Sequence, residues 1–162
     1  MLKEIGTKVI IKDFLVEDEW YPMEEYVADK NIIERLSKSY IKSTGNNILY
    51  KGQEATIVGY NEDKTAYLLN IDNGKNLWTS TMFVDDKILY LGSKVKIKPK
   101  KDIERFGDLI NCRYCGREAT IVGYWYEEMF QLDIDNKYHT WMSCMFEGYP
   151  NFNADIKVVQ IP

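Results

Sequence analysis

The strongest constraint on the fold is an internal repeat, because a chain that carries one pattern twice is expected to build the same unit twice. Residues 6–12, Gly-Thr-Lys-Val-Ile-Ile-Lys, recur 86 positions later as residues 92–98, Gly-Ser-Lys-Val-Lys-Ile-Lys. Residues 52–60, Gly-Gln-Glu-Ala-Thr-Ile-Val-Gly-Tyr, recur 64 positions later as residues 116–124. The two offsets differ by 22 residues, the length of an insertion that only the first copy carries.

Two later blocks keep an offset of 63 residues. Tyr67–Asn73 matches Phe130–Asn136, and Trp78–Phe83 matches Trp141–Phe146. Four blocks in the same order indicate a duplication that covers nearly the whole chain. We therefore expect two domains, residues 1–91 and residues 92–162. They should abut, because no linker rich in Pro, Gly or Ser separates them.

Each repeated block has the pattern of a short β-strand. Residues 94–98 alternate strictly, so Val95 and Ile97 are expected to face inward and the lysines outward. The Asn73-Gly74 pair suits a tight turn with two positive φ angles. About five short strands in each copy of roughly 60 to 90 residues favour a small closed barrel over an open sheet. The predicted fold is all-β, with two tandem five-stranded barrels.

The insertion, at about residues 17–47, departs from the strand pattern. Pro22 suits the first position of a helix, and acidic residues follow it. Apolar residues then recur at helical spacing as far as Tyr40, with a slip in phase near Asp29. We therefore expect a short helical insertion in the first barrel, as one broken helix or two. The matching loop of the second copy suits a single helical turn at residues 102–107.

Together these motifs resemble a known family of folds. A G-x-K-V-x-I-K lead, followed by G-x-E-A-T-I-V-G-Y and W-x-x-x-M-F, is similar to SH3-like barrels of the mind-bomb and KOW-related kind. Such barrels are often short modules of bacterial and phage proteins. The resemblance covers residues 6–90 and residues 92 onward, and it implies a non-enzymatic module that binds a protein, a peptide or nucleic acid through its loops and open barrel face. It carries no individual site residue over to this chain.

Composition narrows the function classes. The 21 Lys+Arg and 25 Asp+Glu residues give a formal net charge of −4, which disfavours a general nucleic-acid binder. No apolar signal core and no run long enough to span a membrane occurs, so we expect a cytoplasmic protein without membrane contact. There is one histidine, His139, and none of the GxSxG, GxxxxGK[ST], GxGxxG or HExxH patterns. These features favour binding over catalysis, and no catalytic residue is assigned.

The amino-acid usage also bears on the partner. Abundant Lys, Ile, Asn, Tyr and Asp are typical of an AT-rich genome, and a compact duplicated barrel is similar in style to phage-encoded accessory proteins. We therefore expect a host or bacterial protein as the partner. One form of that function is an inhibitor of host defence, of the anti-CRISPR type, that blocks a nuclease.

An acidic segment with large aromatic residues lies at the start of the insertion. Its carboxylates suit a basic groove on a partner, with the two aromatic residues as anchors. The same pattern also fits a helix N-terminus with the tryptophan packed on the core, and both interpretations stay open. The candidate residues are Glu17, Asp18, Glu19, Trp20, Tyr21, Glu24 and Glu25.

A second candidate contact is the tip formed by Trp125 and Tyr126, where the first copy has the polar residues 61–64. Two aromatic residues at a hairpin tip are difficult to bury inside a small barrel. They suit an interface with a partner and an interface with the first copy equally.

Lysines mark the alternative site. Lys94, Lys96, Lys98 and Lys100 are expected on one outward strand face, with Lys101 adjacent. Such a stripe suits a phosphate backbone, with bases stacked on Trp125 and Tyr126. A solvated strand face that prevents edge pairing explains the stripe as well, and we favour that interpretation.

Zinc is the one cofactor that the residue types permit. Cys112, Cys115, His139 and Cys144 form an allowed tetrahedral set. On a single strand, however, His139 and Cys144 would lie roughly 16 Å apart and on opposite faces. We therefore expect no cofactor and reduced structural thiols, with zinc as the alternative.

Two further pairs of residues are not assigned to a site. Trp78 and Trp141 occur in both copies beside Met and Phe, which suits barrel framework. Asp133 and Asp135 are expected on an outward strand face, in contact with solvent rather than with a metal.

Overall fold

The computed structural model describes residues 2–23, 27–28, 32–34, 40–85, 88–103, 112–125, 129–149 and 157–159. Within these ranges the chain consists mainly of short β-strands. The two α-helices described, α1 (Gly45–Ile48) and α2 (Lys100–Ile103), have four residues each. The expected all-β character is confirmed.

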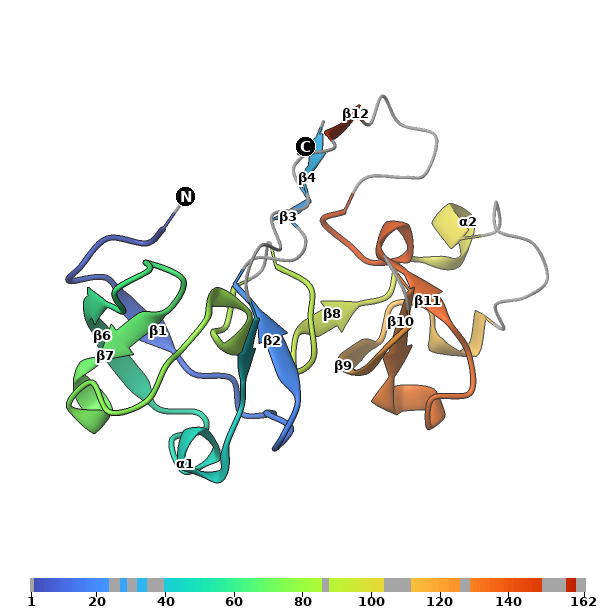
Figure 1. Cartoon of the computed structure of the whole chain (residues 1–162). Helices are drawn as coiled ribbons and strands as arrows, with labels where there is room; N and C mark the ends of the chain where they lie inside the picture. The colour runs from blue at the N-terminus through green and yellow to red at the C-terminus, as the bar shows by residue number, and fades with distance from the viewer. Residues whose placement is uncertain are drawn as a thin grey trace.

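Each copy of the repeat forms its own antiparallel sheet. The first sheet has the order β1 (Lys8–Ile10), β6 (Glu54–Tyr60), β7 (Tyr67–Leu69). The second has the order β11 (Trp141–Met142), β10 (Met129–Leu132), β9 (Glu118–Trp125), β8 (Lys94–Lys96). Figure 1 shows β1, β6 and β7 grouped at one end of the molecule and β8 to β11 at the other, with β2 between them.

The two sheets share the same register. Lys8 pairs with Thr56 in the first copy, and the equivalent Lys94 pairs with Thr120 in the second. The pairing of both long strands is interrupted at the same place, where Val58 and Val122 are extra residues that form a bulge. The sequence repeat is therefore a structural repeat as well.

In each copy the chain returns to its own first strand. Trp78 pairs with Tyr67 of β7, and Phe83 pairs with Ile11, next to β1. A 3-10 turn, η2 (Ser80–Met82), lies between these two contacts. The second copy repeats this path: β11 pairs with β10, η6 (Ser143–Met145) follows, and Phe146 pairs with Ile97 beside β8.

The expected helical insertion is wrong for the residues that the structure describes. β2 (Trp20–Pro22) pairs with β5 (Tyr40–Lys42), and β4 (Ile32–Glu34) lies between β3 (Val27–Ala28) and β12 (Lys157–Val159). β12 comes from the far end of the chain and runs parallel to β4 (Figure 1). Helical spacing of apolar residues cannot reveal a strand partner more than a hundred positions away, and that partner satisfies the backbone of β4.

The helical turn expected in the second copy is confirmed only at its start. α2 ends at Ile103, and residues 104–107 lie outside the described residues. A 3-10 turn, η4 (Cys112–Tyr114), then precedes β9.

Two equivalent tryptophans lie at the centre of the packing. Trp78 and Trp141 have no solvent exposure, and each meets a tyrosine edge-on, with ring centroids 6.2 Å apart for Tyr50 and 6.3 Å apart for Tyr114. Their predicted framework role is confirmed. The buried side chains of both copies belong to one continuous hydrophobic cluster, so the copies share a core.

Each buried tryptophan donates its indole N–H to an aspartate at the end of a 3-10 turn. Trp78 Nε1 lies 3.0 Å from Oδ2 of Asp72 in η1 (Asn70–Asp72), and Trp141 Nε1 lies 3.0 Å from Oδ2 of Asp135 in η5 (Asp133–Asp135). Both aspartates are buried. The expectation that Asp135 faces solvent is wrong, because a buried indole N–H requires an acceptor. Asp133 is exposed, as expected, but it lies in η5 rather than on a strand face.

Lys12 and Gly92 lie where the two copies meet. The Lys12 side chain is buried, and its Nζ donates to Leu91 O at 2.9 Å and to Ser93 Oγ at 3.1 Å. Gly92 has a φ of +86°, and a Cβ at this position would overlap the carbonyl oxygen of Phe14. The junction therefore depends on a buried ammonium group and on a glycine.

Replacing Gly92 with Ala tests the junction. Gly6 is the equivalent residue of the first copy; its φ is +95°, and a Cβ there would meet no atom of the described residues within 4 Å. Both substitutions should lower the free energy of unfolding by about 1–2 kcal/mol because of the positive φ. Gly92→Ala should lose at least about 1 kcal/mol more because of the overlap. Equal losses in urea unfolding would contradict this account.

The turn after each buried aspartate gives a second prediction. Asn73 and Gly74 both have positive φ, as expected, but the equivalents in the second copy are Asn136 and Lys137, with Lys137 at φ 65°. Lys137→Gly should raise the free energy of unfolding by about 0.5–1 kcal/mol, because glycine adopts this conformation without strain. Gly74→Lys should lower it by a similar amount. Thermal unfolding of the two variants measures both effects, and a destabilised Lys137→Gly protein would refute the argument.

Candidate functional site

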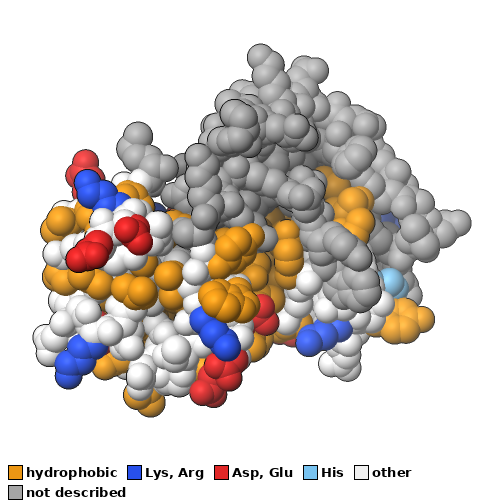
Figure 2. All heavy atoms as spheres, in the orientation of Figure 1, with side chains coloured by type: hydrophobic (Ala, Val, Ile, Leu, Met, Phe, Trp, Pro, Cys, Tyr) orange, Lys and Arg blue, Asp and Glu red, His pale blue; other side chains and the backbone are white. Residues whose placement is uncertain are grey.

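The acidic segment borders β2 and lies largely at the surface. Glu17 and Asp18 are exposed, Glu19 is half-buried, and Trp20 is 53% exposed. Lys42 of β5 lies beside this segment, with its Nζ 5.9 Å from the centre of the Trp20 ring and 3.9 Å from Asp18 Oδ1. Figure 2 shows hydrophobic side chains across the middle of this face, over β2, with charged side chains at their border. Glu24 and Glu25 lie outside the described residues.

Tyr21, the second proposed anchor, belongs to the core. Its side chain has no solvent exposure, and its hydroxyl accepts a hydrogen bond from Val16 N at 3.0 Å. Its ring meets Tyr90 edge-on, with centroids 5.4 Å apart. Burial raises the pKa of Tyr21 to about 12. The surface role of Tyr21 is therefore wrong: alternation along β2 turns its ring inward when Trp20 points outward.

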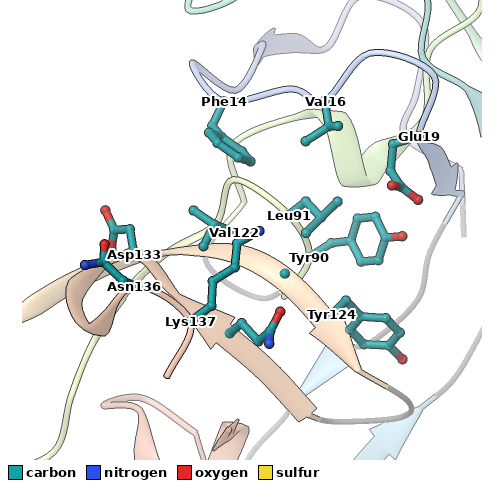
Figure 3. Close-up of a pocket in the computed structure, with 12 residues that line it drawn as sticks. Phe14, Val16, Glu19, Tyr90, Leu91, Val122, Tyr124, Asp133, Asn136 and Lys137 are labelled. Carbon is teal, nitrogen blue, oxygen red and sulfur yellow. The ribbon is translucent and has the colours of Figure 1, made fainter. Parts of the chain in front are cut away.

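A cavity of about 680 Å³ lies between the two copies, next to the acidic segment. Figure 3 shows Phe14, Val16 and Glu19 on one side of it and residues of the second copy on the other, with Tyr90 and Leu91 between them. The second copy contributes Val122, Gly123, Tyr124, Gln131, Asp133, Asn136 and Lys137. We call this space, together with the adjoining residues Glu17–Trp20, the junction face.

Tyrosines connect the cavity to the acidic segment. The Tyr90 and Tyr124 rings lie 5.6 Å apart, and the Tyr90 hydroxyl donates to the backbone oxygen of Trp20 at 2.9 Å. Val122 is the bulge residue of β9, and the bulge directs it toward this space. Val58, its equivalent in β6, is 49% exposed instead. Sequence analysis missed Phe14, Tyr90 and Tyr124, because the cavity forms only where the two copies meet.

The predicted lysine stripe is not a single face. Lys94 and Lys96 are exposed on β8, as expected, but each faces a carboxylate. Lys94 Nζ lies 3.4 Å from Asp13 Oδ2, and Lys96 Nζ lies 3.7 Å from Glu147 Oε2. The outward position of Lys98 is wrong, because its side chain is buried and its Nζ donates to Tyr149 O at 2.8 Å. Burial lowers the pKa of Lys98 below its ordinary value. Lys100 and Lys101 are exposed on α2 rather than on the strand.

The candidate zinc ligands lie in different elements. Cys115 follows η4 and is half-buried, Cys144 is buried within η6, and both are thiols. His139 precedes β11, and its Nδ1 lies 3.1 Å from Asp135 Oδ2. Among the described side chains no three His, Cys, Asp or Glu residues group together as metal ligands. The side chain of Cys112 lies outside the described residues, so the full set is not tested: the absence of a cofactor stays a prediction, with zinc as its alternative.

The aromatic tip is described only in part. β9 ends at Trp125, whose backbone pairs with Met129, and the side chain of Trp125 and all of Tyr126 lie outside the described residues. Their contact with a partner or with the first copy stays a prediction. No helix within the described ranges is long and apolar enough to cross a membrane.

Comparison of the chain with models of protein families, with curated proteins and with solved structures finds no match. The candidate site therefore stands on its own geometry.

Single substitutions separate the roles of the two neighbouring aromatic residues. Trp20→Ala should change the free energy of unfolding by less than about 1 kcal/mol, because the ring is largely exposed. Tyr21→Ala should lower it by about 3–5 kcal/mol, because it removes a fully buried ring. Urea unfolding followed by circular dichroism measures both values. Similar losses for the two variants would contradict the assignment of Trp20 to the surface.

Proposed function

We propose that this chain is a non-enzymatic binding protein and that the junction face receives a segment of a protein partner. The carrying observation is the position of the cavity, which both copies line and which Glu19 borders. A space of about 680 Å³ is within the range of specific binding pockets. Because its walls come from both copies, the duplication itself accounts for the site.

We also propose that each copy is a five-stranded SH3-like barrel. The pairing of Tyr67 with Trp78 and of Ile11 with Phe83 supports this, because one segment then reaches both edges of the first sheet. One hydrogen bond at the closing edge occurs in both copies: Val84 N donates to Ile10 O in the first, and Glu147 N donates to Lys96 O in the second, both at 2.8 Å. A sheet closed in this way leaves few unpaired edges, so binding falls to the loops and to the junction face.

The chemistry of the junction face suggests the chemistry of the partner. Phe14, Tyr90 and Tyr124 offer aromatic surface, and Glu17, Asp18 and Glu19 offer carboxylates. The matching segment carries an apolar side chain for the cavity and Arg or Lys residues for the carboxylates, with Trp20 as an anchor at the border. A basic nucleic-acid-binding groove has this character. The proposed mechanism is steric inhibition of a host or bacterial defence protein such as a nuclease, with carboxylates in the place of phosphates.

Matched lysine substitutions test this proposal. Val122→Lys introduces a cation into the cavity and should reduce retention of the partner at least about tenfold, because it opposes a basic ligand. Val58→Lys places the same charge at the equivalent bulge of the first copy, away from the cavity, and should leave retention unchanged. Trp20→Ala should also reduce retention.

The measurement is an affinity pull-down from host lysate after nuclease treatment, with mass spectrometry. We expect the Val58→Lys protein to retain a specific host protein that the Val122→Lys protein loses. Equal retention by both variants would exclude the junction face. Retention that disappears after nuclease treatment would contradict a protein partner and would favour nucleic acid instead.

A further inference from the structure

Both copies contain the same buried Asp–Trp pair, but the side chain that donates to the aspartate differs between them. In the first copy Asn76 donates twice to Asp72 Oδ2, through its backbone N at 3.1 Å and its Nδ2 at 2.9 Å. In the second copy His139 takes this place, with its backbone N and its Nδ1 both 3.1 Å from Asp135 Oδ2. The scaffold is therefore conserved within the molecule, while the group that it holds has changed from an amide to an imidazole.

Two neighbours of His139 also differ between the copies. Tyr138 stands where the first copy has Lys75, and Arg113 stands where it has Leu49. The second copy thus carries an imidazole, a phenol and a guanidinium where the first carries an amide, an ammonium and an alkyl group. All three border a cavity of about 530 Å³, together with Tyr114, Asp135 and Asn136.

Asp135 sets the orientation of the imidazole. Its side chain is 1% exposed, and its Oδ2 lies 3.1 Å from both the backbone N and the Nδ1 of His139, which holds the ring in place. Nε2 lies on the opposite side of the ring, away from Asp135. Asp135 Oδ1 is buried and accepts no hydrogen bond from the described residues, whereas Asp72 Oδ1 accepts one from Gly74 N at 3.0 Å. The carboxylate in the second copy therefore depends more strongly on the donors that hold its Oδ2.

Tyr138 is exposed to an unusual degree. Its side chain is 83% exposed, and its ring meets His139 edge-on with centroids 4.7 Å apart. One face of the phenol is thus available for stacking next to a fixed imidazole. A second guanidinium lies nearby, because Arg117 sits 5.9 Å from the centre of the Tyr114 ring.

We propose that this second cavity binds a nucleotide, with the base stacked on Tyr138 and the phosphate held by Arg113 and His139. Exposed aromatic rings beside cations are the groups that recognise bases and their phosphates together. The ligand is either a free nucleotide or one unit of a single strand. Arg113 and His139 are the groups at this cavity that can hold phosphate, so we expect contact with one or two phosphates. This inference does not depend on the proposed protein partner.

The two buried tryptophans supply a reporter and an internal control. The ring of His139 lies 6.4 Å from that of Trp141, whereas Trp78 holds the same position in the first copy without a histidine. Adenosine monophosphate is added to the full chain, and binding is followed in ¹H–¹⁵N spectra. The indole N–H signal of Trp141 should shift, and that of Trp78 should stay in place. Adenosine alone and inorganic phosphate alone should each bind at least about tenfold more weakly.

Variants that restore the residues of the first copy separate stacking from charge. Tyr138→Lys should weaken binding about tenfold or more although it adds a positive charge, because it removes the stacking surface. Arg113→Leu should weaken binding to a similar extent. His139→Asn retains donors for Asp135 and so should keep the fold while it reduces phosphate contact. Leu49→Ala, at the equivalent position of the first copy, is the control and should leave affinity unchanged.

An oligothymidylate 12-mer distinguishes the two sources of the ligand. A single strand would be supported as the ligand if the 12-mer binds at least tenfold more tightly than the mononucleotide. The logarithm of its binding constant should then fall with the logarithm of the salt concentration, with a slope of about −0.7 to −1.4. Equal affinity would support a free nucleotide. The proposal is overturned if neither probe shifts the Trp141 signal, if inorganic phosphate binds as well as adenosine monophosphate, or if Tyr138→Lys retains full affinity.

Discussion

Burial of a complete tryptophan side chain in each copy is the constraint on which the rest of the structure depends. An indole N–H removed from water needs an acceptor, and Asp72 and Asp135 supply it. A buried carboxylate needs donors in turn, and these come from the backbone and side chain of the residue four positions later. This requirement determines the 3-10 turn, the left-handed Asn after it, and the return of the chain to the sheet.

Comparison of the two copies shows which positions the packing of the core keeps the same and which positions differ. Trp78 and Trp141 occupy equivalent positions with equivalent partners, and the register of the sheets agrees residue by residue. Other positions differ between the copies. Val58 faces solvent whereas Val122 faces the cavity at the junction, and Asn76 corresponds to His139. Both proposed sites arise from such differences, one at the boundary between the copies and one within the second copy.

Much of the strand content could be predicted because alternation and repetition are local properties. The positive φ values of Asn73 and Gly74 and the framework role of the tryptophans follow from residue type in the same way. Errors arise where a distant group changes the local preference. Residues 32–34 lie in a helical pattern but pair with a strand from the C-terminal end, and Lys98 continues an alternating pattern but turns inward to Tyr149 O. Tyr21 and Trp20 are neighbours of similar character, and their roles separate because β2 turns Tyr21 inward, where its ring packs against Tyr90.

The sequence by itself determined the repeat, the all-β character and the positions of the central tryptophans, because these depend on spacing and residue type along the chain. Only the tertiary structure decided which side of each strand meets the other copy. The cavity at the junction needs Phe14, Tyr90 and Tyr124 together, and the second cavity needs His139 held by Asp135 beside Arg113. Such groups are brought together by packing between segments far apart in the chain, and the free energy of that packing has no counterpart in local sequence.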